Sequence, residues 1–367
     1  MPRKVKAAIA FGPHEPLQMR EVVLADPGPG EVLVRFLASG LCHSDLHVLE
    51  GTAGTAQQRF PIILGHEGIG DIVELGDNVT DFAVGDRVVP YLVPDCGVCA
   101  FCRSGKTNLC VQFQQRWTER RSPFLLDGEP VAAFANIASF AEMTVVPVDM
   151  LTKVNVQARP DHACCIACGV TTGLGAALIT ADVKPGSSVV VFGAGGVGLS
   201  VIQGAKIANA GKIIAVDTND AKRDVALSLG ATDFVNPTEV VDLVPHLVKL
   251  TGIGADYAFE CVGIPALARQ ALECVNPAWG LAVNVGVYPA GSEVSAAPLS
   301  MMMGRRWTGT FMGGAKRQDV ARFVDMYVDG QYDLDQLVSH RLSHEDINSG
   351  FDMMRSGEAV RSVVVYT

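Results

Sequence analysis

The stretch SVVVFGAGGVGLSVI, residues 188–202, decides the fold of this 367-residue chain. Its three consecutive valines predict a buried strand, and the apolar residues after the glycines recur at helical spacing. The turn between them fits the pattern G-x-G-x-x-G. Glycines at such a turn let the backbone approach a pyrophosphate, whose charge the N-terminus of the helix favours. The stretch therefore predicts a dinucleotide site, with a structural glycine-rich turn as the alternative, and its glycines are Gly193, Gly195, Gly196 and Gly198.

The segments that follow this turn repeat the same alternation of strand and helix. KIIAVD (212–217) is a second predicted strand, and DAKRDVALSLG (220–230) is a second predicted helix. ADYAFECVG (255–263) and GLAVNVGVYP (280–289) are strand-like, with a helix-like segment between them. Alternating strands and helices at this period predict a doubly wound parallel sheet, and hence an α/β fold.

Asp217 lies at the end of the second predicted strand, 19 residues after the last glycine of the turn. A carboxylate at this place accepts hydrogen bonds from the adenosine ribose hydroxyls and repels a 2′-phosphate. The sequence therefore predicts NAD rather than NADP as the dinucleotide. A cap for the helix that follows is the alternative role of Asp217.

The two ends of the chain differ in texture from this middle part. The first 150 residues hold short β-like runs separated by Gly and Pro, such as EVLVRFLAS (31–39) and DRVVPYLV (86–93). Such runs predict an irregular, mostly-β domain. The chain after about residue 315 returns to mixed segments and ends on a predicted strand, SVVVYT (362–367). The length also agrees with two domains.

Composition limits the classes of partner. Hydrophobic residues make up 49% and charged residues 19%, which is an ordinary globular balance. The net charge of −10 argues against nucleic acid and anionic membranes, since both reward a basic surface. We therefore expect a small molecule as the partner.

The residues before Gly12 and Pro13 include too few apolar side chains for a signal peptide. Two uncharged runs, 163–181 and 185–205, reach membrane-spanning length, but their glycines, cysteines and hydroxyl residues favour buried segments. The sequence thus predicts a cytoplasmic protein. Its ten cysteines are expected to be reduced thiols, and reduced thiols at tight spacing indicate a metal.

One such group of thiols lies in DCGVCAFCRSGKTNLC, which ends at residue 110. Four thiolates within fifteen residues can close a tetrahedron around Zn²⁺ and leave no position for water, as structural zinc sites do. An iron–sulfur cluster is the alternative, although the ferredoxin pattern has a shorter last gap and a Pro after its fourth Cys. The predicted ligands of a structural zinc are Cys96, Cys99, Cys102 and Cys110.

Three further stretches offer ligands for a second metal. They are GLCHSDLH (40–47), GHEG (65–68) and CCIACG (164–169). A catalytic zinc takes three protein ligands and keeps one open position, and two Cys with one His is a known set. Each residue alone is more often a packing residue than a ligand. Their occurrence beside a four-cysteine group and a dinucleotide motif favours a metal.

Taken together, these motifs resemble the zinc-dependent medium-chain alcohol dehydrogenases over essentially the full length. The resemblance also includes CGVTTG (168–173), VDTN, GATDFVNP and MRSGEAVRSVVV. The segment after Cys110 has the length found in the animal-type and class III-like branch. The resemblance implies a Rossmann cofactor domain of residues 171–314 and a mostly-β GroES-like catalytic domain of residues 1–170 and 315–367. The reaction is then expected in a cleft between the two domains.

The resemblance also implies a role for individual residues around the catalytic zinc. It assigns the ligands Cys42, His66 and Cys168, in preference to Cys164 or Cys165. Glu67 matches the acidic neighbour of the metal, and Asp45 matches the carboxylate that orients the ligand histidine. Ser44 would contact the substrate oxygen, and His47 would be the outer end of the proton relay.

For the cofactor, the resemblance implies contacts from both parts of the chain. His43 would face the pyrophosphate and Arg361 the phosphates. Lys222 would face the adenosine ribose, and Thr172 would lie beside the nicotinamide. We therefore expect two Zn²⁺ per chain, one catalytic and one structural, together with NAD, and a homodimer or a tetramer.

The activity implied is hydride transfer between NAD(H) and a primary alcohol or its aldehyde, including bulky or aromatic ones. The alternative substrate is the formaldehyde–glutathione adduct. That branch has an Arg four residues after the last structural Cys, where this chain has Gln114, and an acidic loop before GHEG, where this chain has only Arg59. Arg116, Arg120 and Arg121 keep anion recognition open. Rivals of other classes are a non-catalytic NAD-binding or zinc-storage protein and a reductase with structural zinc only.

Overall fold

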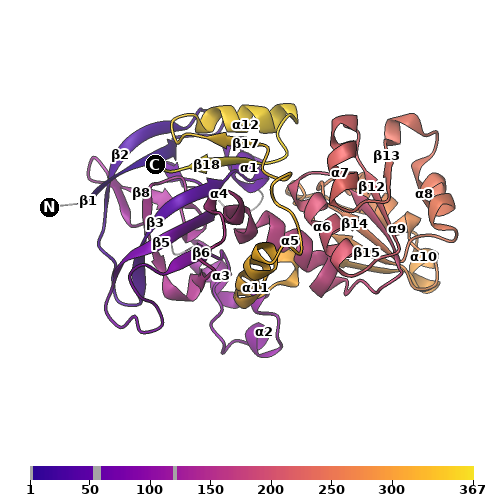
Figure 1. Ribbon diagram of the computed structural model, residues 1–367, viewed down its shortest axis with the longest axis horizontal. Helices are drawn as coiled ribbons and strands as arrows, with labels where there is room; N and C mark the ends of the chain where they lie inside the picture. The colour runs from indigo at the N-terminus through magenta and orange to yellow at the C-terminus, as the bar shows by residue number, and fades with distance from the viewer. Residues whose placement is uncertain (1–2, 53–58, 119–121) are drawn as a thin grey trace. The chain divides into compact units, whose positions relative to one another are not determined.

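The computed structural model describes residues 3–52, 59–118 and 122–367. The chain divides into two compact units, coloured by residue number in Figure 1. Unit 1 consists of Met1–Cys168, Lys316–Gly330 and Leu334–Thr367, and unit 2 consists of Gly169–Ala315 and Gln331–Asp333.

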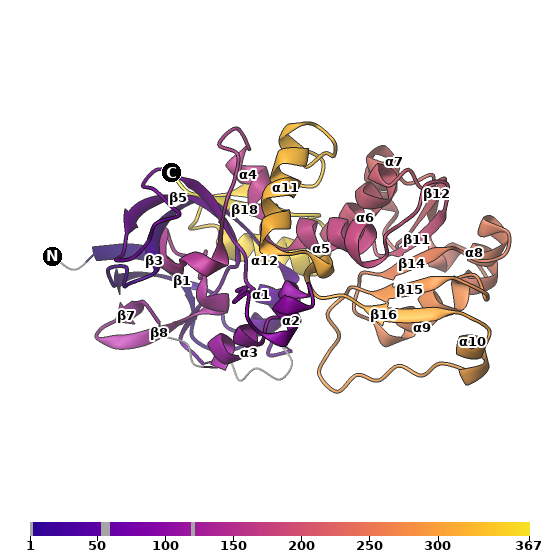
Figure 2. The same ribbon diagram turned by 90° about the horizontal axis from the view of Figure 1, so that it is seen from below.

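Unit 2 is built on a parallel sheet whose strand order is β13-β12-β11-β14-β15-β16, part of which can be followed in Figure 2. Each neighbouring pair in this order runs parallel. The doubly wound sheet predicted from the sequence is confirmed. Its strands are β11 Ser188–Phe192, β12 Lys212–Val216, β13 Asp233–Val235, β14 Tyr257–Glu260, β15 Leu281–Asn284 and β16 Arg306–Gly309.

The helices of unit 2 follow the strands in the alternation that the sequence predicts. The sheet is buried, because its central strands consist of apolar residues such as Val190 and Phe259 with almost no exposed surface. The chain order reverses beside β11, since β12 and β13 lie on one side of it and β14 to β16 on the other. The helices are α5 Gly169–Gly175, α6 Gly196–Ile207, α7 Arg223–Leu229, α8 Leu243–Thr251, α9 Pro265–Cys274 and α10 Pro298–Met302.

Unit 1 contains the irregular β structure. A closed barrel is formed in the order β1-β2-β7-β8-β4, and a second sheet runs β10-β6-β5-β3-β18-β17 with β9 on β3. A core of interleaved Val, Ile, Leu and Phe side chains fills the space around these sheets. The strands are β1 Arg3–Ala10, β2 Gln18–Leu24, β3 Glu31–Gly40, β4 Ile62–Ile63, β5 Glu67–Leu75, β6 Arg87–Pro90, β7 Phe124–Leu126, β8 Glu129–Ala133, β9 Met143–Pro147, β10 Leu151–Lys153, β17 His340–Leu342 and β18 Ser362–Val365.

Two features of unit 1 position the candidate site. The C-terminal strand β18 pairs antiparallel with β3, so that residues more than 300 positions apart become neighbours. The four-cysteine segment forms a separate lobe with α2 and α3, at the lower edge of unit 1 in Figure 1. The helices of unit 1 are α1 His43–Leu49, α2 Ala100–Arg103, α3 Val111–Thr118, α4 Pro160–Ala163, α11 Arg317–Val328 and α12 Ile347–Ser356.

Among the described residues, no single helix has the length and apolar composition needed to cross a membrane. One bent pair of helices, Pro160–Ala167 with Gly169–Thr180, meets those two criteria jointly.

Candidate active site

Four side chains of metal-ligand type converge in unit 1. The ligand atoms of Cys42, His66, Glu67 and Cys168 all lie within 4.8 Å of one another. Two soft thiolates and one imidazole form a donor set that suits Zn²⁺, and the carboxylate lies where it can approach the same ion. The residues present therefore fit a catalytic zinc, and we call these four residues the metal cluster.

Strand pairing explains why residues so distant in sequence meet. The end of β3 pairs with the start of β5, with Gly40 opposite Glu67. His66 directly precedes this pair on β5, and Cys42 follows it two residues after Gly40. The segment that ends at Cys168 packs on this pair, because a Cβ placed on Gly40 would lie 3.4 Å from the sulfur of Cys165. The same Cβ would overlap Oε2 of Glu67, so glycine at position 40 leaves room for that carboxylate.

Asp45 holds the histidine of the metal cluster in place. This fully buried carboxylate accepts a hydrogen bond from the backbone N–H of Gly65 at 2.9 Å and lies 3.3 Å from Nδ1 of His66. A carboxylate at Nδ1 favours the tautomer that leaves Nε2 for a metal. Burial alone lowers the pKa of His66, but the carboxylate of Asp45 and the thiolate of Cys42 outweigh burial and raise it.

A side-chain hydrogen bond joins the two thiols of the metal cluster. A hydrogen bond from Cys168 lowers the pKa of Cys42 well below its usual value, and the nearby cations of His66 and Arg361 lower it further against the effect of burial. The same hydrogen bond raises the pKa of Cys168. The thiolate is the form that binds a metal, so a lowered pKa of Cys42 favours its role as a ligand.

Arg361, the residue directly before β18, lies beside the metal cluster. Its Nη2 donates to Oε1 of Glu67 at 2.9 Å, and its Nη1 donates to the carbonyl oxygen of Leu41 at 2.8 Å. Both side chains of the ion pair are buried. Burial raises the pKa of Glu67, an effect that the guanidinium of Arg361 opposes. The expected role of Arg361 at the cofactor phosphates stays a prediction, since the structure places its guanidinium on Glu67.

The predicted relay residues lie on helix α1, which begins directly after Cys42. The hydroxyl oxygen of Ser44 lies 3.8 Å from the sulfur of Cys42, so it borders the metal cluster. Nδ1 of His47 lies 2.9 Å from the hydroxyl oxygen of Thr52, at a half-buried position. His43 is exposed on the same helix. This placement agrees with a path from the metal cluster to solvent.

The four cysteines of the lobe also converge. The sulfur atoms of Cys96, Cys99, Cys102 and Cys110 lie within 4.8 Å of one another. Backbone N–H groups of Cys99 and Cys102 donate to the sulfurs of Cys96 and Cys99, each at 3.4 Å. Backbone hydrogen bonds, chiefly from Val111 and Cys102, lower the pKa of Cys99 to about 6. Four converging thiols fit a closed structural zinc site.

The predicted dinucleotide turn lies at the carboxyl end of β11 in unit 2. A Cβ at Gly198 would overlap the carbonyl oxygen of Gly193, so only glycine allows this turn. Gly195 precedes helix α6 and Gly196 is its first residue, which places backbone N–H groups at the start of the helix. The hydroxyl of Thr172 lies 3.8 Å from the sulfur of Met312.

Asp217 directly follows β12 and faces the turn. Its Oδ2 accepts from the backbone N–H of Ala194 at 2.8 Å and from Nζ of Lys222 at 3.1 Å. Its Oδ1 accepts from the backbone N–H of Asn219 at 2.9 Å. The alternative role as a helix cap is wrong, because the side chain of Asn219 caps the helical turn at 220–222. The carboxylate thus lies between the turn and the side chain of Lys222, and its role at the adenosine ribose stays a prediction.

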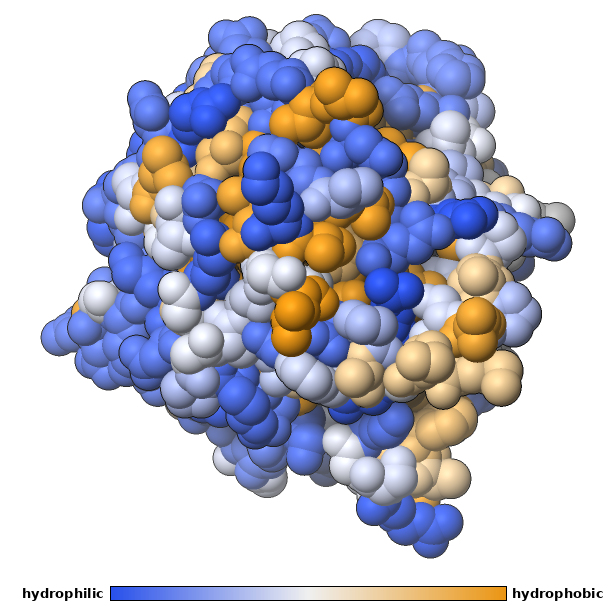
Figure 3. Space-filling model, turned by 90° about the vertical axis from the view of Figure 1, so that its right-hand side faces the viewer, coloured by the Kyte–Doolittle hydropathy of each residue, from blue (hydrophilic) through white to orange (hydrophobic). Residues whose placement is uncertain are grey.

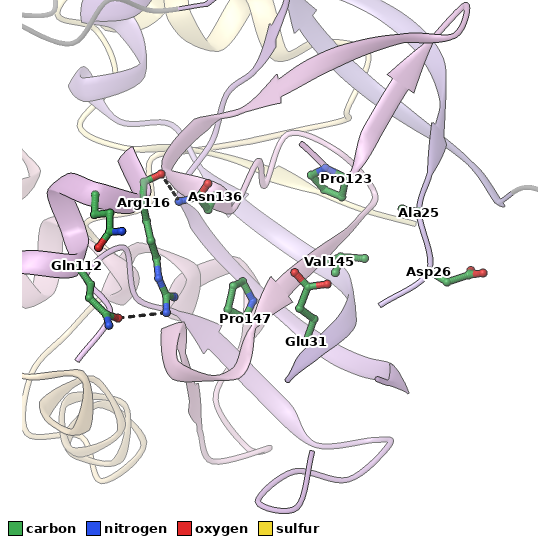
Figure 4. A pocket seen from close by; sticks show the side chains of 10 residues that line it. Ala25, Asp26, Glu31, Gln112, Arg116, Pro123, Asn136, Val145 and Pro147 are labelled. Carbon is green, nitrogen blue, oxygen red and sulfur yellow. Dashed lines mark hydrogen bonds between the residues drawn. The ribbon is translucent and has the colours of Figure 1, made fainter. Parts of the chain in front are cut away.

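The arginines considered for anion recognition do not form a free basic patch in the described part of the chain. Both Nη atoms of Arg116 bind the carboxylate of Asp149, and Nη2 also contacts Gln112. Arg120 and Arg121 lie outside the described residues. Arg116 lines a cavity of about 350 Å³ (Figure 4), whose described lining includes no residue of the metal cluster.

Two family models match the chain. The model of the alcohol dehydrogenase GroES-like domain matches residues 28–156, and the model of the zinc-binding dehydrogenase domain matches residues 196–329. The chain belongs to the zinc-dependent medium-chain alcohol dehydrogenases. The resemblance inferred from the sequence is thereby confirmed, together with the Rossmann and GroES-like fold. This dehydrogenase is a zinc-binding oxidoreductase of the alcohol dehydrogenase type.

Individual relatives of the dehydrogenase are similar over their full length. The S-(hydroxymethyl)glutathione dehydrogenase of Synechocystis sp. is 44% identical over 370 residues, which cover 99% of this chain and 100% of the relative. The class-3 alcohol dehydrogenase of Cereibacter sphaeroides is 44% identical over 377 residues, with the same coverage. The crystal structure of benzyl alcohol dehydrogenase from Acinetobacter calcoaceticus superposes with a TM-score of 0.92 at 28% identity and covers 100% of both chains.

Sequence reasoning missed two contacts beside these sites. One is the ion pair between Arg361 and Glu67, which joins residues 294 positions apart. The other is a hydrogen bond between Tyr288 and the buried Glu260 in unit 2. No local pattern indicates either contact, because each depends on which strand ends the fold brings together.

Proposed function

We propose that this dehydrogenase oxidises S-(hydroxymethyl)glutathione with NAD as the hydride acceptor. The observation that carries the proposal is the full-length similarity, at 44% identity, to an S-(hydroxymethyl)glutathione dehydrogenase. The sequence alone led us to expect a free primary alcohol and to keep the thiol adduct as the alternative. The relatives support the adduct better than that expectation.

When bound, Zn²⁺ lowers the pKa of a coordinated hydroxyl, to ~7 in the case of water, and NAD supplies the hydride acceptor. Cys42, His66 and Cys168 would hold the metal, and Asp45 keeps the imidazole in the required tautomer. Glu67 is a carboxylate next to the same site, and Arg361 balances its charge. These residues create the electrostatic field in which a substrate hydroxyl loses its proton.

The proton leaves through the residues of α1. Ser44 borders the metal cluster and can accept the proton from the substrate hydroxyl while donating its own. His47 lies at a half-buried position on the same helix, where its imidazole can pass the proton on to water. In unit 2, Asp217 would bind the adenosine ribose of NAD, and the start of α6 would receive the pyrophosphate.

A free primary alcohol with a bulky or aromatic group is the second candidate substrate. One observation in its favour is Gln114, which lies in α3 where the glutathione-dependent branch has an Arg. Another is the ion pair between Arg116 and Asp149, which occupies that guanidinium. The structural similarity to a benzyl alcohol dehydrogenase points in the same direction. Recognition of glutathione must therefore come from other residues if the main proposal holds.

The rate of NADH formation at 340 nm separates the two substrates. The proposal predicts a kcat/KM for formaldehyde with glutathione at least tenfold above that for benzyl alcohol. It also predicts that Gln114→Arg raises the value for the adduct, because an Arg can bind a glutathione carboxylate with two hydrogen bonds. Gln115→Arg, one position along α3, is the matched control and should change neither value. Turnover of free alcohols alone would contradict the adduct.

We also propose a cytoplasmic homodimer. Every cysteine of the chain lies within the described residues and is a free thiol, which agrees with a reducing compartment. Strand β16 lies at one edge of the described sheet, and α10 before it exposes Leu299, Met301 and Met302. Figure 3 looks onto the end of unit 2 and shows hydrophobic side chains grouped there. Such an edge suits pairing with a second copy, which sedimentation at micromolar concentration can test, with a tetramer as the other outcome.

A further inference from the structure

Unit 2 contains a buried carboxylate that the proposed chemistry does not use. Glu260 ends β14 and has no exposed surface. Its Oε1 accepts from the backbone N–H groups of Val262 at 2.9 Å, Gly263 at 2.8 Å and Ile264 at 3.3 Å. Its Oε2 accepts from the hydroxyl of Tyr288 at 2.6 Å. A buried carboxylate is costly unless its oxygens are satisfied, and here both are.

These hydrogen bonds join two loops at the carboxyl edge of the sheet. Residues 261–264 follow β14, and residues 285–288 follow β15. The backbone N–H groups of Val285 and Gly286 donate to the carbonyl oxygen of Glu260 at 2.8 and 2.9 Å. A Cβ at Gly263 would overlap the carbonyl oxygen of Val287, so the two loops touch backbone to backbone. Burial and the nearby Glu260 raise the pKa of Tyr288, which keeps its hydroxyl protonated and donating.

The first of these loops lies against the dinucleotide turn. The backbone N–H of Cys261 donates to the carbonyl oxygen of Phe192 at 3.0 Å, and a Cβ at Gly193 would lie 2.6 Å from the side chain of Val262. The loops also present apolar side chains to solvent, with Val262 45% exposed and Val287 61% exposed. Exposed apolar groups beside a pyrophosphate site are suited to a flat ring of a ligand.

The strand order assigns the two halves of the dinucleotide. Asp217 follows β12, on one side of β11, whereas Glu260 and Tyr288 follow β14 and β15 on its other side. A dinucleotide lies across the carboxyl edge where the strand order reverses. With the adenosine ribose at Asp217, the loops 261–264 and 285–288 face the nicotinamide half.

We propose that Glu260 and Tyr288 are positioning residues, which fix these two loops in the shape that receives the nicotinamide half of NAD(H). The inference rests on the proposed NAD-dependent function. Glu260 gathers the three N–H groups of its own loop, and Tyr288 locks the neighbouring loop to the same carboxylate. Neither residue needs to contact the reacting atoms.

Binding of NADH and of ADP-ribose, which lacks the nicotinamide, tests this role. We expect the dissociation constant of NADH to be about tenfold higher for Tyr288→Phe than for the wild type. This is the effect expected from loss of one hydrogen bond to a charged group. The dissociation constant for ADP-ribose should stay within twofold. Tyr257→Phe, on β14, is the matched control and should bind both ligands as the wild type does.

A second pair of variants tests the carboxylate. Glu260→Gln keeps an oxygen for the three N–H groups and can donate to Tyr288, so it should bind NADH within about threefold of the wild type. Glu260→Ala removes the acceptor and should bind NADH worst, again with ADP-ribose little affected. Equal NADH affinities for Tyr288→Phe and the wild type, or equal losses for both ligands, would overturn the inference alone. A wild-type protein that binds no NADH would overturn it together with the proposed function.

Discussion

Nη2 of Arg361 lies 2.9 Å from Oε1 of Glu67, and both side chains are buried beside the ligand atoms of Cys42 and His66. The contact joins the last strand of the chain to the start of β5, because β18 pairs with β3 and β3 pairs with β5. The carboxylate of Glu67 in the metal cluster is thus balanced by the guanidinium of Arg361. A buried pair of this kind contributes little by itself but is costly to break.

Removal of Arg361 alone should therefore destabilise the protein strongly. Arg361→Met removes the guanidinium that binds the buried carboxylate of Glu67, and we expect the free energy of unfolding to fall by about 3–5 kcal/mol. The double variant with Glu67→Met should recover part of this loss, since both charges of the ion pair are then removed. Denaturant titrations of the single and double variants form a thermodynamic cycle. If the loss in the double variant equalled the sum of the losses in the two single variants, Arg361 and Glu67 would not be coupled.

Asp217 should determine the preference for NAD over NADP. Asp217→Ala removes the carboxylate that would repel a 2′-phosphate and leaves Lys222 nearby as a cation. We expect kcat/KM to fall about 10- to 100-fold with NAD, and to rise with NADP. Asp224→Ala, on the following helix, is the control and should leave the ratio of the two cofactors unchanged. An unchanged ratio in the Asp217 variant would remove this residue from the ribose site.

The four-cysteine lobe should hold a metal that stabilises the fold without serving the reaction. Cys99→Ser is expected to lower the metal content by one zinc per chain and to lower the melting temperature. The rate per folded molecule should stay close to that of the wild type, because the lobe is separate from the metal cluster. Metal analysis and calorimetry are the measurements, with Cys274→Ser as the control that keeps both metals. Loss of turnover in fully folded Cys99→Ser would contradict a structural role.

Stability at acidic pH should depend on Asp161, which forms hydrogen bonds or ion pairs with Arg341 and His162. Burial alone would raise the pKa of Asp161, but these two contacts outweigh burial and lower it from 3.8 to about 2. A lowered pKa in the folded state stabilises above the ordinary pKa, and the effect is lost as the pH falls from about 4 to about 2.

The matching experiment compares the free energy of unfolding of the wild type and Asp161→Asn. Because the carboxylate is partly exposed to solvent, we expect a difference of only about 1 kcal/mol at pH 7, which shrinks towards zero below pH 3. Asp182→Asn, at an exposed position, should show almost no difference at either pH. A difference for Asp161 that grows on acidification would reverse the sign of the argument.

The fold was predictable where local pattern and chemistry agree. The residues 188–202 predict a strand, a glycine turn and a helix because each has its own residue preference, and β11 and α6 follow that prediction. The four cysteines of the lobe were predictable from spacing alone, since their ligand geometry is local. Cys42, His66 and Cys168 required the resemblance to a family, because only strand pairing brings them together.

Other features were beyond reach of the sequence for physical reasons. The partner of Arg361 depends on the pairing of β18 with β3, and the link between Glu260 and Tyr288 depends on two loops that meet only at the edge of the sheet. The sequence shows that Arg116 is a cation, but only the structure shows that it forms an ion pair with Asp149. The sequence placed a free primary alcohol before the thiol adduct because of Gln114 and of the loop that carries only Arg59, whereas the relatives support the adduct better.

The proposed function requires that Cys42, His66 and Cys168 bind one ion that serves turnover. The direct measurement is zinc content and NADH formation in Cys168→Ser, with the buried neighbour Cys164→Ser as the matched control. We predict one zinc fewer per chain and at least a thousandfold lower rate in Cys168→Ser, with two zincs and near wild-type rate in Cys164→Ser. A Cys168→Ser protein that keeps two zincs and the wild-type rate would contradict the central claim.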